Sequence, residues 1–205
     1  PYCRLFDEAD ACATYPARTV GSRARDTGFW RALVEQQRAL LPYVSLRLRQ
    51  VELVETQRRD LVQAAVQGDR GFVFLHVIAP HTPWIWDHEE QDYTLTEFSP
   101  DGMFANLELA DRMLGEIRAA MEAAGQWDES AVIVTSDHVA QYRPRWIEEP
   151  DDARVPFIVK LPGADGGVVY DRPFNALLVH ELASELLHGR LASYAELTAW
   201  LDARQ

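Results

Sequence analysis

Residues 131–141 read AVIVTSDHVAQ, and they decide how the rest of the chain is interpreted. The β-branched run from Val132 to Val134 indicates a buried strand, because such side chains pack well on a pleated surface. The strand gives way to a polar turn in which Asp137 and His138 stand side by side. A carboxylate and a neutral imidazole are good ligands for a divalent cation. The alternative is an aspartate that caps the next turn beside a surface histidine.

Two more apolar runs indicate strands, GFVFLHVIAP at 71–80 and RVPFIVKLPG at 154–163. The first is continuous enough to be buried on both faces. Between it and residue 131 lie a polar loop of about twenty residues and then an amphipathic helix at 104–126. The helical spacing of this segment predicts a buried face that consists of Leu107, Ala110, Leu114, Ile117 and Met121. Further helices are expected at 29–41, 46–67, 173–188 and 193–203.

This order of strands and helices predicts an α/β fold, a layered and largely parallel sheet flanked by helices. We expect one domain over residues 1–205, with an irregular and helical flank at 1–70 and the core at 71–190. Sites in such sheets gather at the carboxyl ends of strands. One strand end leads to Pro80 and His81, and another leads to Asp137 and His138.

Composition narrows the class of partner. The chain is 47% hydrophobic and 25% charged, as in globular proteins, and its formal net charge is −12. Without a basic stripe, such a chain is not expected to bind nucleic acid. An anionic substrate would need a local positive centre, which a bound metal can supply. Lys160, Arg143 and Arg145 are candidate anion contacts, although ordinary surface charge is the better explanation of the two arginines.

The sequence also suggests a compartment. No apolar run approaches the roughly 20 residues that span a bilayer, and no signal peptide is evident. The chain starts at Pro1, so we expect a piece of a longer protein whose remainder could hold a membrane tether. Cys3 and Cys12 lie close together in an acidic segment, where a disulfide in an oxidising compartment or a pair of unrelated thiols are the alternatives.

The strands and their polar ends resemble a known family. The motifs FLHVIAPHTPW, AVIVTSDH and RVPFIVKLPG, with the helix between the first two, resemble in order and spacing the C-terminal half of the alkaline phosphatase and sulfatase superfamily. That superfamily includes arylsulfatases, phosphoethanolamine transferases and lipoteichoic acid synthases. The resemblance covers about residues 71–163.

The resemblance implies roles for particular residues. Asp137 and His138 match the family's SDHG motif and would bind a divalent metal such as zinc, calcium, magnesium or manganese. His81, in the PHTP motif at 80–83, would hydrogen-bond the transferred sulfuryl or phosphoryl group. Lys160 is a further candidate for substrate binding. The substrate would be an anionic sulfate or phosphate ester, and the protein would be extracytoplasmic, at the cell surface or in the periplasm.

Two departures from the family pattern stand out. Val139 replaces the family's glycine after Asp-His, and a valine resists backbone conformations that glycine permits. The family's first metal-binding acid and its Ser, Thr or Cys nucleophile belong to an N-terminal half that we do not find. The TYPAR segment at 14–18 fits a nucleophile pattern, but no buried strand with an acidic end precedes it, so we interpret it as a coincidence.

The leading hypothesis is a metal-dependent hydrolase or phosphotransferase of the sulfatase type, present as a fragment that lacks the nucleophile and is inactive alone. The rival hypothesis is a non-catalytic sulfatase-like domain that serves as a binding or interaction module. A third possibility is an unrelated α/β protein with a chance Asp-His pair.

Overall fold

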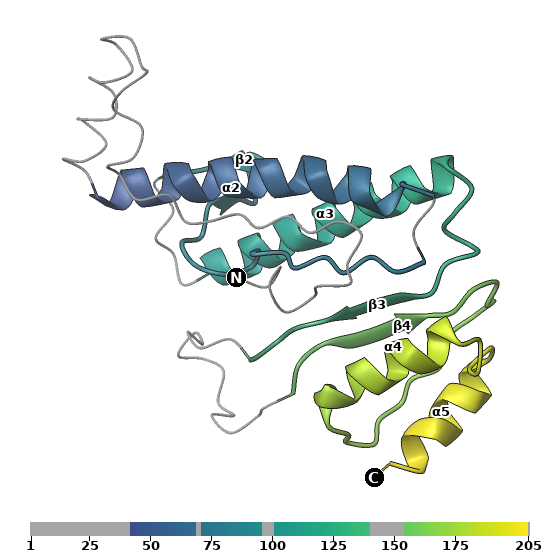
Figure 1. Ribbon diagram of the computed structural model, residues 1–205. Coiled ribbons are helices and arrows are strands. Elements are labelled where there is room, and N and C mark those ends of the chain that lie inside the picture. The colour runs from purple at the N-terminus through teal and green to yellow at the C-terminus, as the bar shows by residue number, and fades with distance from the viewer. Residues whose placement is uncertain (1–41, 69–70, 96–100, 140–153, 205) are drawn as a thin grey trace, which may run out of the picture. The chain divides into compact units, whose positions relative to one another are not determined.

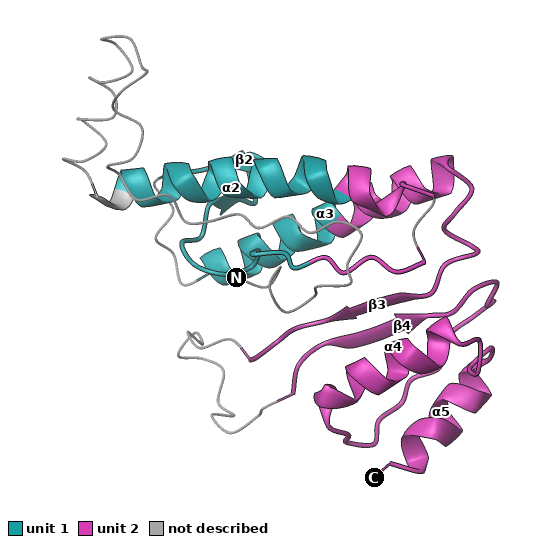
Figure 2. Cartoon of the chain, viewed as in Figure 1, with its two compact units in different colours: residues 1–61, 76–113 teal, residues 62–75, 114–205 magenta. Residues whose placement is uncertain are grey.

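The computed structural model describes residues 42–68, 71–95, 101–139 and 154–204. The chain divides into two compact units (Figure 2). Unit 1 comprises Pro1–Leu61 and His76–Met113, and unit 2 comprises Val62–Leu75 and Leu114–Gln205. Several features predicted from sequence lie outside the described residues: the helix at 29–41, the TYPAR segment, Cys3, Cys12, Arg143 and Arg145.

Two long helices, α2 (Pro42–Ala65) and α3 (Gly102–Ala123), confirm the helices predicted at 46–67 and 104–126 (Figure 1). The buried face of α3 agrees with the predicted one only in part. The predicted Met121 is buried, but so are Asn106, Leu109 and Met113, whereas the predicted Leu107 is 41% exposed. The apolar positions of this helix support two neighbouring stripes, and the packing partners select the stripe that contains the asparagine.

Unit 1 has its core beside these helices. The fully or nearly fully buried apolar side chains of its described residues are Val54, Leu61, Ala79, Ile85, Trp86, Leu109 and Met113. Gly102, at the start of α3, has room for no side chain, because an added Cβ would lie 2.8 Å from Cε3 of Trp84. The face of α3 that carries Gly102 and Asn106 therefore packs against the segment around Trp84.

A short hairpin follows this segment, in the region that the sequence predicted to be an irregular loop. Strands β1 (Trp86–Asp87) and β2 (Asp92–Tyr93) are antiparallel, with Trp86 opposite Tyr93. The Asp87 carboxylate accepts hydrogen bonds from the backbone amides of Glu89 and Glu90, at 2.9 and 3.0 Å. Such aspartate turns make a tight connection between strands without any glycine.

Unit 2 contains the second sheet. Strands β3 (Val132–Thr135) and β4 (Phe157–Lys160) are antiparallel, with Val132 opposite Lys160 and Thr135 opposite Phe157. The side chains of Ile133, Phe157 and Val159 pack on a core of buried leucines. The leucines come from α4 (Val179–Leu187), α5 (Tyr194–Asp202) and their connection: Leu182, Leu191, Leu197 and Leu201. A 3-10 helix, η2 (Ala176–Leu178), precedes α4.

The strand predictions are confirmed in part. β3 and β4 fall within the predicted strands at 131–136 and 154–163. Both sheets of the described residues are antiparallel, so the largely parallel sheet is not confirmed. The predicted strand at 71–80 forms neither a helix nor a ladder with another strand, and Phe72 and Phe74 are 58% and 67% exposed. In the described parts of the chain, no helix is both long enough and apolar enough to cross a bilayer.

Candidate functional site

The turn after β3 presents the acid and imidazole that the sequence singled out. Asp137 and His138 are exposed, and His138 Nε2 lies 3.8 Å from Asp137 Oδ1. The Nδ1 atom of His138 lies 2.7 Å from the carbonyl oxygen of Val139. Because a carbonyl oxygen only accepts, this contact requires a proton on Nδ1 and leaves the Nε2 lone pair of the neutral ring available. The hydroxyl of Ser136 donates to the His138 carbonyl at 2.8 Å and closes the turn.

The donor atoms of this turn fit a divalent cation in their chemistry. Two ligands of one tetrahedral zinc ion lie about 3.3 Å apart, so exposed side chains that start at 3.8 Å need only a small rotation. A metal ligand that donates its other ring nitrogen to a backbone carbonyl is a common arrangement. Metal sites use at least three protein ligands as a rule, and among the described residues no three or more His, Cys, Asp or Glu side chains are placed so that together they could hold a metal ion. The turn thus presents two side chains of a type suited to binding a metal.

Val139 is accommodated without backbone strain. Among the non-glycine residues that the structure describes, Gln91 alone has a positive φ, of 54°. Val139 therefore adopts backbone angles that a β-branched residue tolerates. The replacement of the family's glycine does not prevent the turn from forming.

His81 lies in unit 1, directly after the apolar segment 72–80, whereas Asp137 and His138 lie in unit 2. The backbone amide of His81 donates to the carbonyl oxygen of Ile78 at 2.8 Å. Its exposed ring has Nδ1 2.6 Å from the carbonyl oxygen of Thr82. As in His138, Nδ1 must carry the proton, and Nε2 is left for a ligand.

The segment that carries His81 is held by two buried carboxamides. Gln57 of α2 donates to the His76 carbonyl at 3.2 Å and accepts from the Ile78 amide at 3.3 Å. Asn106 of α3 bonds to the backbone on both sides of His81. The sequence interpretation missed both residues, although one signal was present: an asparagine beside the apolar stripe of a long helix.

Lys160 does not join the Asp-His turn. It pairs with Val132, at the end of the ladder opposite Thr135 and the turn that follows it. Its ammonium donates to the carbonyl oxygens of Trp127 and of Ser130, the latter at 2.9 Å, and stands 5.3 Å from the centroid of the Trp127 ring. Burial lowers the pKa of Lys160, and the Asp128 carboxylate opposes this effect. The contacts of this lysine therefore serve the connection between α3 and β3.

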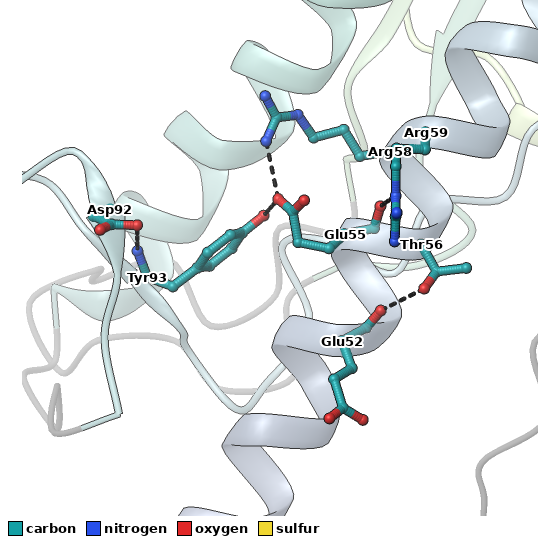
Figure 3. Close-up of polar contacts among 7 residues, drawn as sticks. All are labelled: Glu52, Glu55, Thr56, Arg58, Arg59, Asp92 and Tyr93. Atoms are coloured by element: carbon teal, nitrogen blue, oxygen red, sulfur yellow. Dashed lines mark hydrogen bonds and ion pairs between the residues drawn. The ribbon is translucent and has the colours of Figure 1, made fainter.

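The β1–β2 hairpin, just after the His81 segment, is fastened at two points. His88 Nδ1 lies 2.6 Å from Oε2 of Glu108 on α3. The Tyr93 hydroxyl donates to Glu55 on α2 at 2.6 Å (Figure 3). The hairpin therefore has a charged or hydrogen-bonded link to each of the helices that hold the His81 segment.

Comparison with known proteins is informative at the level of family. The family model described as Sulfatase matches residues 53–187, more than half of the chain. Searches of curated proteins and of solved structures give no match. Sulfatases generally use a divalent metal and act on sulfate esters, which are anionic substrates. The chain belongs to the sulfatase family, within the alkaline phosphatase and sulfatase superfamily.

Proposed function

We propose that this chain is part of a metal-dependent hydrolase or transferase of the sulfatase type, acting on a sulfuric or phosphoric ester. The observation that carries the proposal is the turn after β3. There an exposed carboxylate and the Nε2 atom of an imidazole lie 3.8 Å apart, while the other ring nitrogen is engaged by a backbone carbonyl. Asp137 and His138 would contribute two ligands to the cation. A divalent cation in such a site polarises an ester oxygen and activates an oxygen nucleophile.

His81 would bind the sulfuryl or phosphoryl group. Its Nδ1 proton is directed at the Thr82 carbonyl, so Nε2 is the ring nitrogen that is left for a ligand. In the imidazolium form, Nε2 donates a charge-assisted hydrogen bond to an anionic oxygen. This donor would stabilise the negative charge that develops on the transferred group.

The nucleophile is assigned to no residue of the described chain. We therefore expect the 205-residue chain to bind cation and anion without turning over esters. We also propose that the parent protein is extracytoplasmic and membrane-tethered. The pair of cysteines near the start of the sequence supports an oxidising compartment.

Titration of the full chain with zinc, calcium, magnesium and manganese salts, followed by calorimetry and thermal unfolding, tests the proposal. One of these cations should bind and raise the unfolding temperature, since binding to the folded state stabilises it. D137A and H138A should each remove the effect. D165A and H180A, which change an exposed acid and an exposed histidine of unit 2, should preserve it.

A chain that binds none of the four cations, or binds one equally well after D137A and H138A, would refute the assignment of the metal ligands. It would favour the second candidate function, a non-catalytic sulfatase-like module that binds a partner. Ester hydrolysis by the isolated wild-type chain would contradict the expected absence of a nucleophile.

A further inference from the structure

Asn106 is a polar side chain in the interior of unit 1, 1% exposed. Its Oδ1 atom accepts hydrogen bonds from the backbone amides of Ile85 and Trp86, at 3.0 and 3.2 Å. Its Nδ2 atom donates to the carbonyl oxygens of His81 and Pro80, at 3.2 and 3.4 Å. All four hydrogen-bonding positions of the carboxamide are therefore used, and all four partners belong to the segment 80–86.

The two carbonyls have a special relation to His81. The Pro80 carbonyl belongs to the peptide group before the His81 Cα atom, and the His81 carbonyl belongs to the peptide group after it. One amide nitrogen therefore contacts both peptide groups that set the direction of the His81 Cα–Cβ bond. The His81 amide is fixed separately by its hydrogen bond to Ile78. The backbone that carries the exposed His81 ring is thus held by three hydrogen bonds.

We propose that Asn106 is the positioning residue for His81: it fixes the imidazole in the orientation in which Nε2 meets the sulfuryl or phosphoryl oxygens. This inference rests on the proposed role of His81. No other side chain of this size offers two acceptor positions and two donors in one plane. A leucine of similar volume would leave two buried amides and two carbonyls without partners, and such groups are rarely tolerated.

Gly102 supports the same arrangement. It lies one turn before Asn106 on α3, and an added Cβ at this position would contact the ring and Cβ of Trp84 at 2.8–3.0 Å. The backbone of α3 therefore approaches the segment closely enough for the short asparagine side chain to reach four backbone groups. A glutamine at 106 would be too long for this gap.

A purely structural role predicts a different result from a positioning role. Leu109 lies on the same buried face of α3, is 1% exposed, and contributes no side-chain hydrogen bond. L109A therefore lowers stability by opening a cavity without removing a contact to the His81 peptide groups. It is the matched control for loss of stability alone.

N106D tests the acceptor oxygen and the donor nitrogen of the carboxamide separately. Its carboxylate retains an acceptor for the Ile85 and Trp86 amides, but it presents no donor to the His81 and Pro80 carbonyls. N106S, which is smaller and retains one hydroxyl, removes most of both halves without introducing a charge. If one of these two variants shows no cooperative unfolding transition, the measurements on the other variant decide the test.

The measurement is nitrogen and carbon NMR of the full chain labelled in its histidine rings, with His81 identified by the signal that H81Q removes. Without any ligand, N106D and N106S should shift the His81 ring signals and reduce the fraction of the Nδ1–H tautomer. L109A, at equal or greater loss of stability, should leave the His81 signals in place. Unchanged His81 signals in both Asn106 variants would overturn the proposal.

Titration with inorganic sulfate and with inorganic phosphate, in the presence of the divalent cation that the chain binds, gives the second readout. The wild-type His81 signals should respond, and N106D and N106S should weaken this binding by roughly tenfold or more, since small misplacements of a binding group cost that much. L109A should retain the wild-type affinity within about twofold. Wild-type affinity in both Asn106 variants would overturn the positioning role.

The two proposals fail in different ways. If the wild-type His81 signals respond to neither anion, the proposed role of His81 is wrong. The ligand-free shifts then still decide whether Asn106 controls the His81 ring. If the wild type binds an anion at His81 and the Asn106 variants bind it equally well, the proposed function stands and the positioning role falls.

Discussion

Tyr93 of β2 donates a 2.6 Å hydrogen bond to the Glu55 carboxylate of α2, and Arg58 donates to the same oxygen at 2.9 Å (Figure 3). The Tyr93 hydrogen bond is the largest cause of a lowered pKa at Glu55, and burial opposes it. Burial, followed by the same hydrogen bond, raises the pKa of Tyr93. The link joins the hairpin after the His81 segment to the long helix α2.

Y93F should destabilise the folded chain at neutral pH by about 1–2 kcal/mol, because a hydrogen bond to a charged group is lost. A carboxyl whose pKa is lowered by folding contributes stability above its unfolded pKa, and loses it as pH falls through the folded pKa. The loss in free energy of unfolding that Y93F causes should therefore become smaller in acid. Urea unfolding of the wild type and of Y93F at pH 7 and near pH 3 measures this loss. An equal cost at both pH values would contradict this account.

His88, which pairs with Glu108, gives the opposite pH dependence to Glu55. The Glu108 hydrogen bond is the largest cause of a raised pKa at His88. The pKa of Glu108 is lowered, first by the hydrogen bond from Gln91 and then by His88. A histidine whose pKa is raised by folding contributes stability below its unfolded pKa and loses it as pH rises through the folded pKa.

E108Q should therefore lower the titration midpoint of the His88 ring, as followed by proton NMR. E116Q, which changes another acid of α3, is the control and should leave the midpoint in place. A midpoint at His88 that E108Q does not move would show that the link is absent in solution.

The Cβ that G102A adds would overpack against the Trp84 ring, and this effect alone should lower the free energy of unfolding by about 1–3 kcal/mol. The helix propensity of alanine acts in the other direction and is worth about 1 kcal/mol. Chemical unfolding gives the net effect, and a change in tryptophan fluorescence should accompany it.

G115A is the matched control on the same helix. An added Cβ at Gly115 meets nothing within 4 Å, so only propensity acts, and the variant should gain about 0.5–1 kcal/mol. A G102A variant that is stabilised as much as G115A would disprove the close packing of Trp84 on α3.

Lys160 is the only lysine of the chain, and its contacts predict a structural effect. K160M should destabilise by about 1–3 kcal/mol, because the Trp127 and Ser130 carbonyls lose a charged donor. The affinities of the K160M variant for sulfate and for phosphate, measured by calorimetry, should equal those of the wild type. Reduced anion affinity with unchanged stability would instead support the substrate-binding role that the sequence suggested.

Local patterns in the sequence were sufficient for much of the fold. The apolar periodicity of α2 and α3 and the β-branched run of β3 predicted these elements within a few residues. These signals are local, because the period of a segment's own apolar residues distinguishes a helix from a strand. The motifs around His81 and Asp137 likewise indicated the family, and the match to the family model confirms it.

Local patterns did not predict which segments pair as strands, or in which direction. The run at 71–80 has the composition of a buried strand, yet its backbone is bound in part by the side chains of Gln57 and Asn106. β3 and β4 are antiparallel, a direction that neither strand encodes alone. A hydrogen-bond partner distant in sequence decides both outcomes.

The sequence by itself determined the helices, the polar turns and the family, because each depends on neighbouring residues or on a short motif. Only the tertiary structure decided that Asn106 belongs to the buried face of α3 and that the ammonium of Lys160 binds two carbonyl oxygens. The physical reason is that a buried polar group takes whichever partners the fold brings within hydrogen-bonding distance, and those partners lie 20 to 33 residues away.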